Sequence, residues 1–376
     1  MFDNNTIKEK FFYEVAISND VIDDEWDNFV LQTPGGHYAQ TALWAQAQVI
    51  RGWHCLRIVL KEQDKIVGGA QILLRKISIF GSIGYLCKGP VCDILDNNLI
   101  KVVLKEIQKV CKKNHIFYLI VKPPDNGESI SHLMPDMGFH KAVDLFGDVT
   151  SVAIDLTLDF DCILAKMDKR KRYAIRLIER RKPLICREGT QQDIPIFYRL
   201  HSSTSQRVGF TPYCEEFYKR LWNIFEPKGY IKLFLSEYEG EPISGLLVIP
   251  YKDICYAYKS GWSGNYSKLY PNDTVWWEAI RWAKLNGYHF LDFGGICPEA
   301  ALAIQQNKPI PEWTINTFSR FKLDYGGQVL FYPDTFDDIN NPVLDWGYRT
   351  VYPRIHAPKI KNTINHLFRR HTEKQD

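Results

Sequence analysis

The sequence, 376 residues long, has no long apolar run and no leader-like N-terminus. Its first residues are polar and charged, and no hydrophobic stretch approaches the ~20 residues that cross a membrane. We therefore expect a cytoplasmic protein. The nine cysteines are scattered, with no C-x-x-C pair, which favours reduced thiols and argues against a zinc site.

Motifs for covalent, metal and nucleotide chemistry are missing too. The sequence has no G-x-S-x-G elbow, no H-E-x-x-H pair and no P-loop, and the glycines of 81–89 are too irregular for a dinucleotide fingerprint. No cysteine has an activating setting. We expect neither a metal nor a cofactor, and the chemistry that remains works by bringing two substrates together.

The composition is that of a globular α/β protein, with 45% hydrophobic and 24% charged residues. A net charge of +3 is too small to imply a polyanionic partner by itself, so local charge has to decide. The length is sufficient for two ordinary domains.

One order of elements occurs twice in the chain. Two strands, a helix and a buried strand are expected in 53–121 and again in 230–293, an offset of roughly 175 residues. We predict two α/β domains of one topology, 1–160 and 161–335, with a cleft between them and a basic tail at 336–376. The alternative is that mixed α/β chains often look alike.

The most charged segment, Lys166 to Lys182, has the pattern of a helix with one basic side. Polyanion or phospholipid binding is the sharper interpretation, and a solvated basic surface is the alternative. In the tail, basic residues interleave with apolar ones, which suits an anionic membrane surface as well as a solvated terminus. The tail's basic residues are Arg349, Arg354, Lys359, Lys361, Arg369 and Arg370.

Cys255 to Gly295 is predicted to be one strand–loop–helix–strand unit, closed by Gly294-Gly295. Asp273 is expected to cap its helix. We interpret this unit as the scaffold of a ligand site. Asp292 ends its last strand and is a weak candidate for a general base, because a buried structural carboxylate is more common there.

Acyl transfer from an activated ester to an amine needs only proximity and a stabilised oxyanion. A single buried cation can provide that stabilisation. Lys322, flanked by aromatic residues and followed by Gly326-Gly327, is the best candidate, and a lysine on a surface strand is the alternative.

Several segments, in this order, resemble the FemABX family of peptidoglycan-bridge aminoacyltransferases, which are built from two GNAT-like domains. They span about residues 12–332, and each is weak alone. The segments are QTALW at 40–44 with Gly52-Trp53, KGPV at 88–91, KRKRYAIRLIE at 169–179, Thr204 with Arg207 and Gly209-Phe210, Tyr258–Gly261, Tyr270-Pro271-Asn272, Asp292–Gly295, and Phe321-Lys322-x-x-Tyr325-Gly326.

The resemblance implies transfer of an amino acid from aminoacyl-tRNA to the stem-peptide amine of a lipid-linked peptidoglycan precursor. It implies that Lys322 lies at the reaction centre or on the lipid pyrophosphate, and that Arg207 contacts phosphate, although a helix C-terminal charge explains Arg207 as well. The expected substrate-binding residues are Arg207, Tyr213, Tyr258, Lys259 and Phe321. The expected phosphate or tRNA contacts are Lys169, Arg170, Arg172 and Arg176.

The sequence also departs from the family pattern. The better-known members carry a coiled-coil arm in the second domain, whereas helix 215–225 here runs directly into the next strand. Gln46 and Gln48 stand where members often carry a lysine. Loop 261–272 lacks the pyrophosphate loop of acyl-CoA enzymes, and bulky residues such as Tyr266 would crowd CoA, which is therefore disfavoured.

Two alternatives stay open at this point. One is an acyl-CoA N-acyltransferase that acts on a sugar or polysaccharide precursor, and the other is a non-catalytic GNAT-like module that docks on anionic lipid. For the leading hypothesis we expect a monomer that works at the inner face of the plasma membrane.

Overall fold

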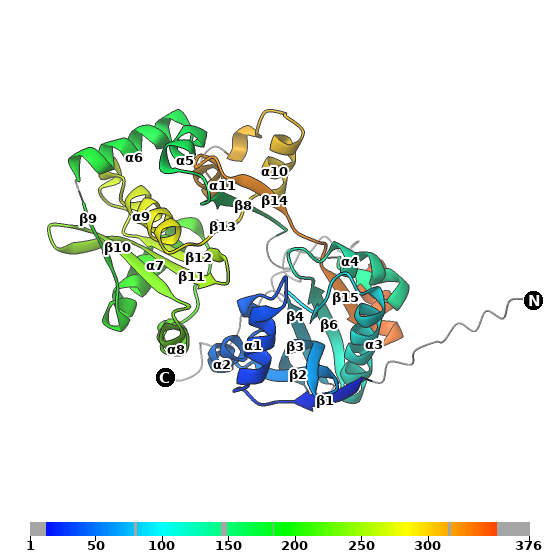
Figure 1. Cartoon of the computed structure of the whole chain (residues 1–376). Helices are drawn as coiled ribbons and strands as arrows, with labels where there is room; N and C mark the ends of the chain where they lie inside the picture. Colours follow the sequence, from blue (N-terminus) through cyan, green and yellow to red (C-terminus); the bar gives the residue numbers. More distant parts are fainter. Residues whose placement is uncertain (1–12, 79–80, 144–148, 183, 315–316, 352–376) are drawn as a thin grey trace, which may run out of the picture. The chain divides into compact units, whose positions relative to one another are not determined.

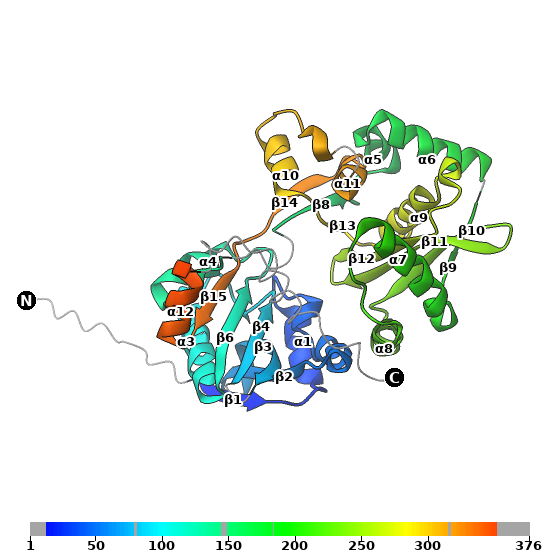
Figure 2. The same ribbon diagram turned by 180° about the vertical axis from the view of Figure 1, so that it is seen from behind.

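Buried apolar side chains form two separate core clusters, one in each of two α/β units. The computed structural model describes residues 13–78, 81–143, 149–182, 184–314 and 317–351. Within these, the first unit takes in 13–45, 53–142 and 335–351, and the second takes in 46–52 and 143–334. Figures 1 and 2 show the chain from opposite sides.

The first unit is built on an eight-stranded sheet of order β1-β2-β3-β4-β6-β15-β7, with β5 paired to β3. Its helices cover both faces: Gly69 on β3 faces Trp26 of α1, while the neighbouring Gly68 faces Val103 of α3. Its elements are β1 (Glu14–Ser18), α1 (Asp24–Gln32), α2 (Ala42–Gln48), β2 (His54–Glu62), β3 (Lys65–Ser78), β4 (Gly81–Cys87), β5 (Val91–Cys92), α3 (Asn97–Lys113), β6 (Ile116–Lys122), α4 (Glu128–Leu133), β7 (His140–Lys141), β15 (Phe336–Ile339) and α12 (Pro342–Trp346).

The second unit repeats this plan on a seven-stranded sheet, β14-β8-β13-β12-β11-β10-β9. Figures 1 and 2 show α9 on one face of the sheet and α7 on the other. Its elements are β8 (Thr150–Asp155), α5 (Phe160–Lys166), α6 (Lys169–Arg181), β9 (Ile185–Glu188), α7 (Ile194–Val208), α8 (Glu215–Phe225), β10 (Lys232–Tyr238), β11 (Glu241–Tyr251), β12 (Ile254–Trp262), α9 (Pro271–Leu285), β13 (Phe290–Gly295), α10 (Pro298–Gln305), α11 (Phe318–Leu323) and β14 (Gln328–Phe331).

The duplication predicted from the sequence is present. Strands β2-β3-β4, helix α3 and strand β6 match β10-β11-β12, α9 and β13 in order and pairing. In both sheets the last strand of the repeat is parallel to its neighbour, in the pairs β4·β6 and β12·β13. The fold class expected from the sequence, two GNAT-like domains in tandem, agrees with this topology.

The domain boundaries differ from those expected. Strand β8 belongs to the second sheet, where it pairs with β13, so that unit begins near residue 143 and not at 161. Strand β15 pairs with β6 of the first sheet, so residues 336–351 are not a tail. In each sheet one further strand lies beside the parallel pair. Strand β8, which precedes the second repeat, pairs with β13, and β15, which follows it, returns to pair with β6. The remaining tail residues, including Arg354, Lys359, Lys361, Arg369 and Arg370, lie outside the described part.

Two local expectations have clear outcomes. Helix α8 passes through a short turn at Glu226–Lys228 into β10, so the described chain between these elements contains no inserted arm. The N-cap assigned to Asp273 is wrong, because α9 begins two residues earlier, at Pro271, and Asp273 lies buried in its first turn.

Candidate functional site

The parallel strands β12 and β13 separate within the second sheet. They pair from Ile254 to Tyr256, and β12 then runs on to Trp262 along β11. Strand β13 bulges after Asp292 and ends at Gly294-Gly295, with Gly294 in a left-handed conformation (φ 74°). Ligands of α/β sheets commonly bind where strands diverge at their carboxyl ends, so this split between β12 and β13 is a candidate ligand site.

Lys322 lies in this split. It is held on α11, is 6% exposed, and donates from Nζ to the Gly295 carbonyl oxygen at 2.7 Å. A β-carbon added at Gly294 would lie 3.6 Å from Lys322 Nζ and 3.8 Å from the Ala257 carbonyl oxygen of β12. The lysine is therefore buried against the Gly294-Gly295 turn and lies on a helix, so the alternative of a lysine on a surface strand is wrong.

Asp292 holds the turn from the other side. Its carboxylate accepts hydrogen bonds from Ser151 Oγ, from Tyr332 Oη at 2.6 Å and from the Gly294 amide at 2.7 Å. Burial and the neighbouring carboxylate raise the pKa of Tyr332, so its hydroxyl remains a donor. Three neutral donors occupy this buried carboxylate, and this geometry favours a role in positioning the turn. Its role as a base stays a prediction.

Phe321 is partly buried and packs against the core. Its ring packs against Trp276 (centroids 6.0 Å apart) and Tyr325 (5.6 Å), within the core of the second unit. The Lys171 ammonium lies 3.9 Å from its centroid. Phe321 thus packs between the core and the basic helix α6, next to Lys322 in the chain. Its predicted contact with substrate stays a prediction.

Lys171 is a residue that the sequence analysis missed. Unlike the other basic residues of α6 it is buried, and it forms an ion pair with Asp273 of α9, which also accepts a hydrogen bond from Tyr325 Oη at 3.0 Å. One signal was visible in the sequence: Lys171 lies four residues before Ile175, on the apolar stripe of the helix. Asp273 is therefore an ion-pair partner.

The helix predicted for the basic segment exists as α6. Lys169, Arg170 and Arg176 are exposed on it, whereas Arg172 is partly buried and donates to the Ala165 carbonyl oxygen at 3.1 Å. The opposite side is anchored, since Trp277 of α9 donates from Nε1 to Glu179 at 3.0 Å. The structure thus presents three of the four predicted cations to solvent.

Arg207 and Lys259 belong to a second group of cations, on α7 and β12. Arg207 donates to Ser203 Oγ (2.8 Å) and to the Trp262 carbonyl oxygen (2.6 Å), and its guanidinium lies 5.0 Å from the Trp262 ring centroid. The Lys259 ammonium lies 5.1 Å from the Tyr258 centroid and 5.6 Å from that of Tyr213.

Arg51 joins this group and was also missed. Its guanidinium stacks 3.8 Å from the Tyr213 centroid, so Tyr213 contacts two cations. Arg51 belongs to the short stretch 46–52 that clusters with the second unit, and it donates to Gln48 Oε1 at 2.6 Å. Four of the five predicted substrate-binding residues therefore lie on one group of elements, α7, the α7–α8 connection and β12.

His201 lies beneath the same surface. Its Nδ1 is 2.7 Å from the Ser260 carbonyl oxygen, and its ring stacks on Phe197 with centroids 5.8 Å apart. Burial lowers the pKa of His201 to about 4, and Lys259 contributes in the same direction. The imidazole is therefore neutral near pH 7 and adds no charge to this surface.

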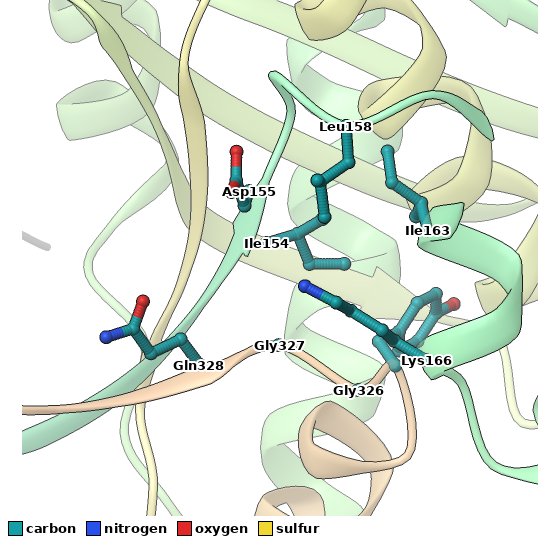
Figure 3. A pocket seen from close by; sticks show the side chains of 9 residues that line it. Ile154, Asp155, Leu158, Ile163, Lys166, Gly326, Gly327 and Gln328 are labelled. Carbon is teal, nitrogen blue, oxygen red and sulfur yellow. The ribbon is translucent and has the colours of Figure 1, made fainter. Parts of the chain in front are cut away.

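A pocket in the second unit lies between β8, α5 and the Gly326-Gly327 turn (Figure 3). Lys166 reaches across it from the end of α5 toward β8. Its volume is about 60 Å³, far below the roughly 300–1,000 Å³ of pockets for drug-sized ligands. It holds a few waters at most, so we do not assign the substrate to it.

The described residues contain neither a cluster of metal ligands nor a membrane-crossing helix. No group of three or more His, Cys, Asp or Glu side chains lies together as metal ligands would. No helix in the described ranges combines the length and the apolarity that a membrane crossing requires.

Comparison with known proteins gives the same picture of the chain. A model of the FemAB family matches residues 21–133, and a model of the acetyltransferase (GNAT) domain matches residues 165–300. The crystal structure of FemX superposes with a TM-score of 0.75 at 17% identity, covering 92% of this chain and all of that one. The chain is therefore similar to the FemAB family over its first unit and to the GNAT domain over its second. The superposition supports the fold expected from the sequence, two GNAT-like domains in tandem.

One curated protein and one further solved structure are also similar to this chain. The lipid II:glycine glycyltransferase of Staphylococcus saprophyticus is 24% identical over 234 residues, which are 59% of this chain and 56% of that protein. The chain thus spans little more than half the length of this curated relative. The structure of L-PGS from Bacillus licheniformis has a TM-score of 0.55 at 12% identity, covering 90% of this chain and 98% of that one, and likewise supports the fold alone.

Proposed function

We propose that this protein transfers an amino acid from aminoacyl-tRNA to the stem-peptide amine of a lipid-linked peptidoglycan precursor. The relatives named lipid II:glycine glycyltransferase support the reaction class and the acceptor. The observation that carries the proposal is Lys322, a buried cation fixed in the split between two parallel strands.

The reaction needs no covalent enzyme intermediate. The acceptor amine attacks the carbonyl carbon of the aminoacyl ester, an N–C bond forms, and the negative charge moves to the carbonyl oxygen. The C–O bond to the tRNA then breaks, and the proton lost by the amine balances the one gained by the released hydroxyl. Lys322 stabilises the oxyanion, and loss of one such contact typically costs about 2.7–4 kcal/mol of transition-state stabilisation.

The acceptor's pyrophosphate fits the group formed by Arg207, Lys259 and Tyr213. Arg207 can pair with phosphate oxygens through its planar fork, and Lys259 adds a second charge on an aromatic surface. His201 beneath them is neutral, so it contributes packing to this surface and no charge.

The donor is proposed to be tRNA and not CoA. A helix N-terminus binds pyrophosphate through free backbone N–H groups. In the second unit α9 begins with Pro271, which has no N–H, and in the first unit the Asp96 carboxylate already caps α3 by accepting from Asn98 and Leu99. The exposed Lys169, Arg170 and Arg176 of α6 offer charge for a phosphate backbone instead.

The setting follows from the acceptor. A lipid-linked precursor places the work at the inner face of the plasma membrane, where a peripheral contact with anionic lipid brings enzyme and substrate together. We propose that the protein works there as a cytoplasmic monomer.

The decisive experiment incubates the protein with charged tRNA pools and a lipid-linked muropeptide, and reads the product mass. One added amino-acid residue is the expected result, and Lys322→Met is the matched inactive control. A parallel arm replaces tRNA by acyl-CoA. No added mass with any tRNA pool, or transfer from CoA alone, would overturn the proposal.

A further inference from the structure

Two large aromatic side chains that shortly precede Lys322 in the sequence are exposed in the second unit. Trp313 is 62% exposed and Phe318 is 47% exposed, on the segment that leads from α10 into α11. The Lys322 ammonium lies 5.0 Å from the Phe318 ring centroid. Leaving such rings in water forgoes the free energy of burying them, so two exposed rings on this segment, one of them beside a buried cation, require an explanation.

These two residues are held on a fixed base. Phe318 stacks on Phe321 with centroids 5.7 Å apart and planes 13° apart, and Phe321 is packed into the core. Thr317 donates to the Thr314 carbonyl oxygen from its amide (3.0 Å) and its hydroxyl (2.6 Å), and Thr314 is fully buried. Trp313 is thus followed directly by a buried residue, and Phe318 is preceded directly by a residue hydrogen-bonded to it.

The basic helix begins on the other side of the same ring stack. The Lys171 ammonium of α6 covers Phe321, and the Asp168 amide donates to the Asp324 carbonyl oxygen at 2.8 Å. Figures 1 and 2 both show α5 and the start of α6 beside α11. The exposed cations at the start of α6, the exposed ring of Phe318 and Lys322 therefore follow one another on one part of the second unit.

We propose that Phe318 and Trp313 form a stacking platform for the unpaired bases at the 3′ end of the donor RNA, and that α6 binds the phosphates that precede them. Single-stranded nucleic acid is typically bound by this combination of a basic track and aromatic faces. A base stacked on Phe318 would deliver the 3′-terminal ester toward Lys322. This inference rests on the proposed function, because it presumes an aminoacyl-tRNA donor.

The test measures binding without catalysis. A fluorescein-labelled RNA hexanucleotide ending in CCA is titrated with the full chain and followed by anisotropy. Phe318→Ala should weaken binding about tenfold, within the range for loss of one stacked base, and Phe318→Tyr should restore it. Trp313→Ala should act similarly. Trp346→Ala is the matched control, because Trp346 is 61% exposed but lies in the first unit, and it should change nothing.

A second measurement separates rings from charges. Arg170→Gln and Arg176→Gln should reduce the dependence of affinity on salt, whereas Phe318→Ala should lower affinity equally at every salt concentration. Binding of the oligonucleotide that is unaffected by Phe318→Ala and Trp313→Ala refutes the platform. So does binding of anionic lipid vesicles that both substitutions abolish while leaving RNA affinity intact.

The outcome also distinguishes the platform from the function on which it rests. If the protein transfers from aminoacyl-tRNA and Phe318→Ala leaves the KM for tRNA unchanged, the platform is wrong and the function stands. If the unaltered protein neither transfers nor binds RNA, both fail. If Phe318→Ala raises the KM for tRNA and leaves kcat near its normal value, both are supported.

Discussion

The two units end their parallel strand pairs in different ways. In the first unit β4 and β6 stay paired up to Cys87 and Lys122, their last residues, and the Gly89 amide adds one more hydrogen bond to the Lys122 carbonyl oxygen at 3.1 Å. In the second unit β12 and β13 pair only from Ile254 to Tyr256, although β12 continues to Trp262.

The space beside each pair is also used differently. In the first unit the buried Gln40 side chain bridges the neighbouring strands, donating to the carbonyl oxygens of Gln71 (3.1 Å) and Cys87 (2.7 Å). A buried lysine is present there too, but Lys88 forms an ion pair with Asp125. In the second unit Lys322 donates to a backbone carbonyl and lies beside the exposed ring of Phe318. One topology thus yields a parallel pair that stays closed and one that separates, and we propose the chemistry for the second.

The largest effect is expected from breaking the ion pair under the split. Lys171→Met should lower the free energy of unfolding by about 3–5 kcal/mol, because Asp273 would stay charged and buried. Lys88→Met in the first unit should cost less, since the Asp125 side chain is 30% exposed and can be hydrated. Urea unfolding of both variants tests this, and equal losses would remove the difference between the units.

Activity should distinguish Lys322 of the second unit from Lys88 of the first. Lys322→Met should reduce kcat about 100- to 1,000-fold, the usual effect of removing one oxyanion donor. Lys88→Met, with a lysine equally buried at the end of the other parallel pair, should retain kcat within a few-fold when folded. Steady-state kinetics with both substrates measures this, and a comparable loss in Lys88→Met would show that the first unit takes part in the chemistry.

Acid should affect the units in opposite directions. Burial lowers the pKa of His201 to about 4 in the folded protein. As the pH falls below about 6.5, the unfolded state therefore binds a proton that the folded state does not bind. The free energy of unfolding of the second unit should fall by about 2 kcal/mol between pH 7 and pH 5. Burial raises the pKa of Asp27 and Asp337 in the first unit to about 6, so their contribution rises over the same range.

Hydrogen exchange in each unit at the two pH values checks this. His201→Asn can keep the hydrogen bond to Ser260 and should abolish the acid sensitivity of the second unit alone. An unchanged pH dependence in His201→Asn would contradict the assignment.

The smallest effect concerns Asp292. Asp292→Asn should lower kcat about tenfold, or about 1.4 kcal/mol, with little change in KM, because the amide satisfies the Ser151, Tyr332 and Gly294 donors less well and loosens the turn that orients Lys322. If Asp292 were the general base, the acidic limb of the pH–rate profile would disappear in this variant.

The predictable part of this protein is local. The duplicated order of elements, the basic helix α6 and the choice of Lys322, beside aromatic residues and before Gly326-Gly327, follow from periodicity, turn residues and charge within short windows. The resemblance then added the reaction, and through Arg207, Tyr213, Tyr258 and Lys259 a set that lies together on neighbouring elements of the second unit.

What escaped prediction is pairing over long separations. Ser151 and Asp292 are 141 residues apart and Lys171 and Asp273 are 102 apart, and nothing near any of them in the sequence marks its partner. Lys171 appeared to be one more solvent cation, and Asp273 appeared to be a cap, because burial is a property of the folded chain.

The sequence by itself determined two α/β units, a basic helix and one candidate lysine among aromatic residues, because helix and strand periods and glycine turns act over a few residues. Only the tertiary structure decided that β8 pairs with β13 and β15 with β6, outside the duplicated elements, and that β12 and β13 separate beside Lys322. Strand pairing depends on which edges are available once both sheets have formed, and that information is spread over the whole chain.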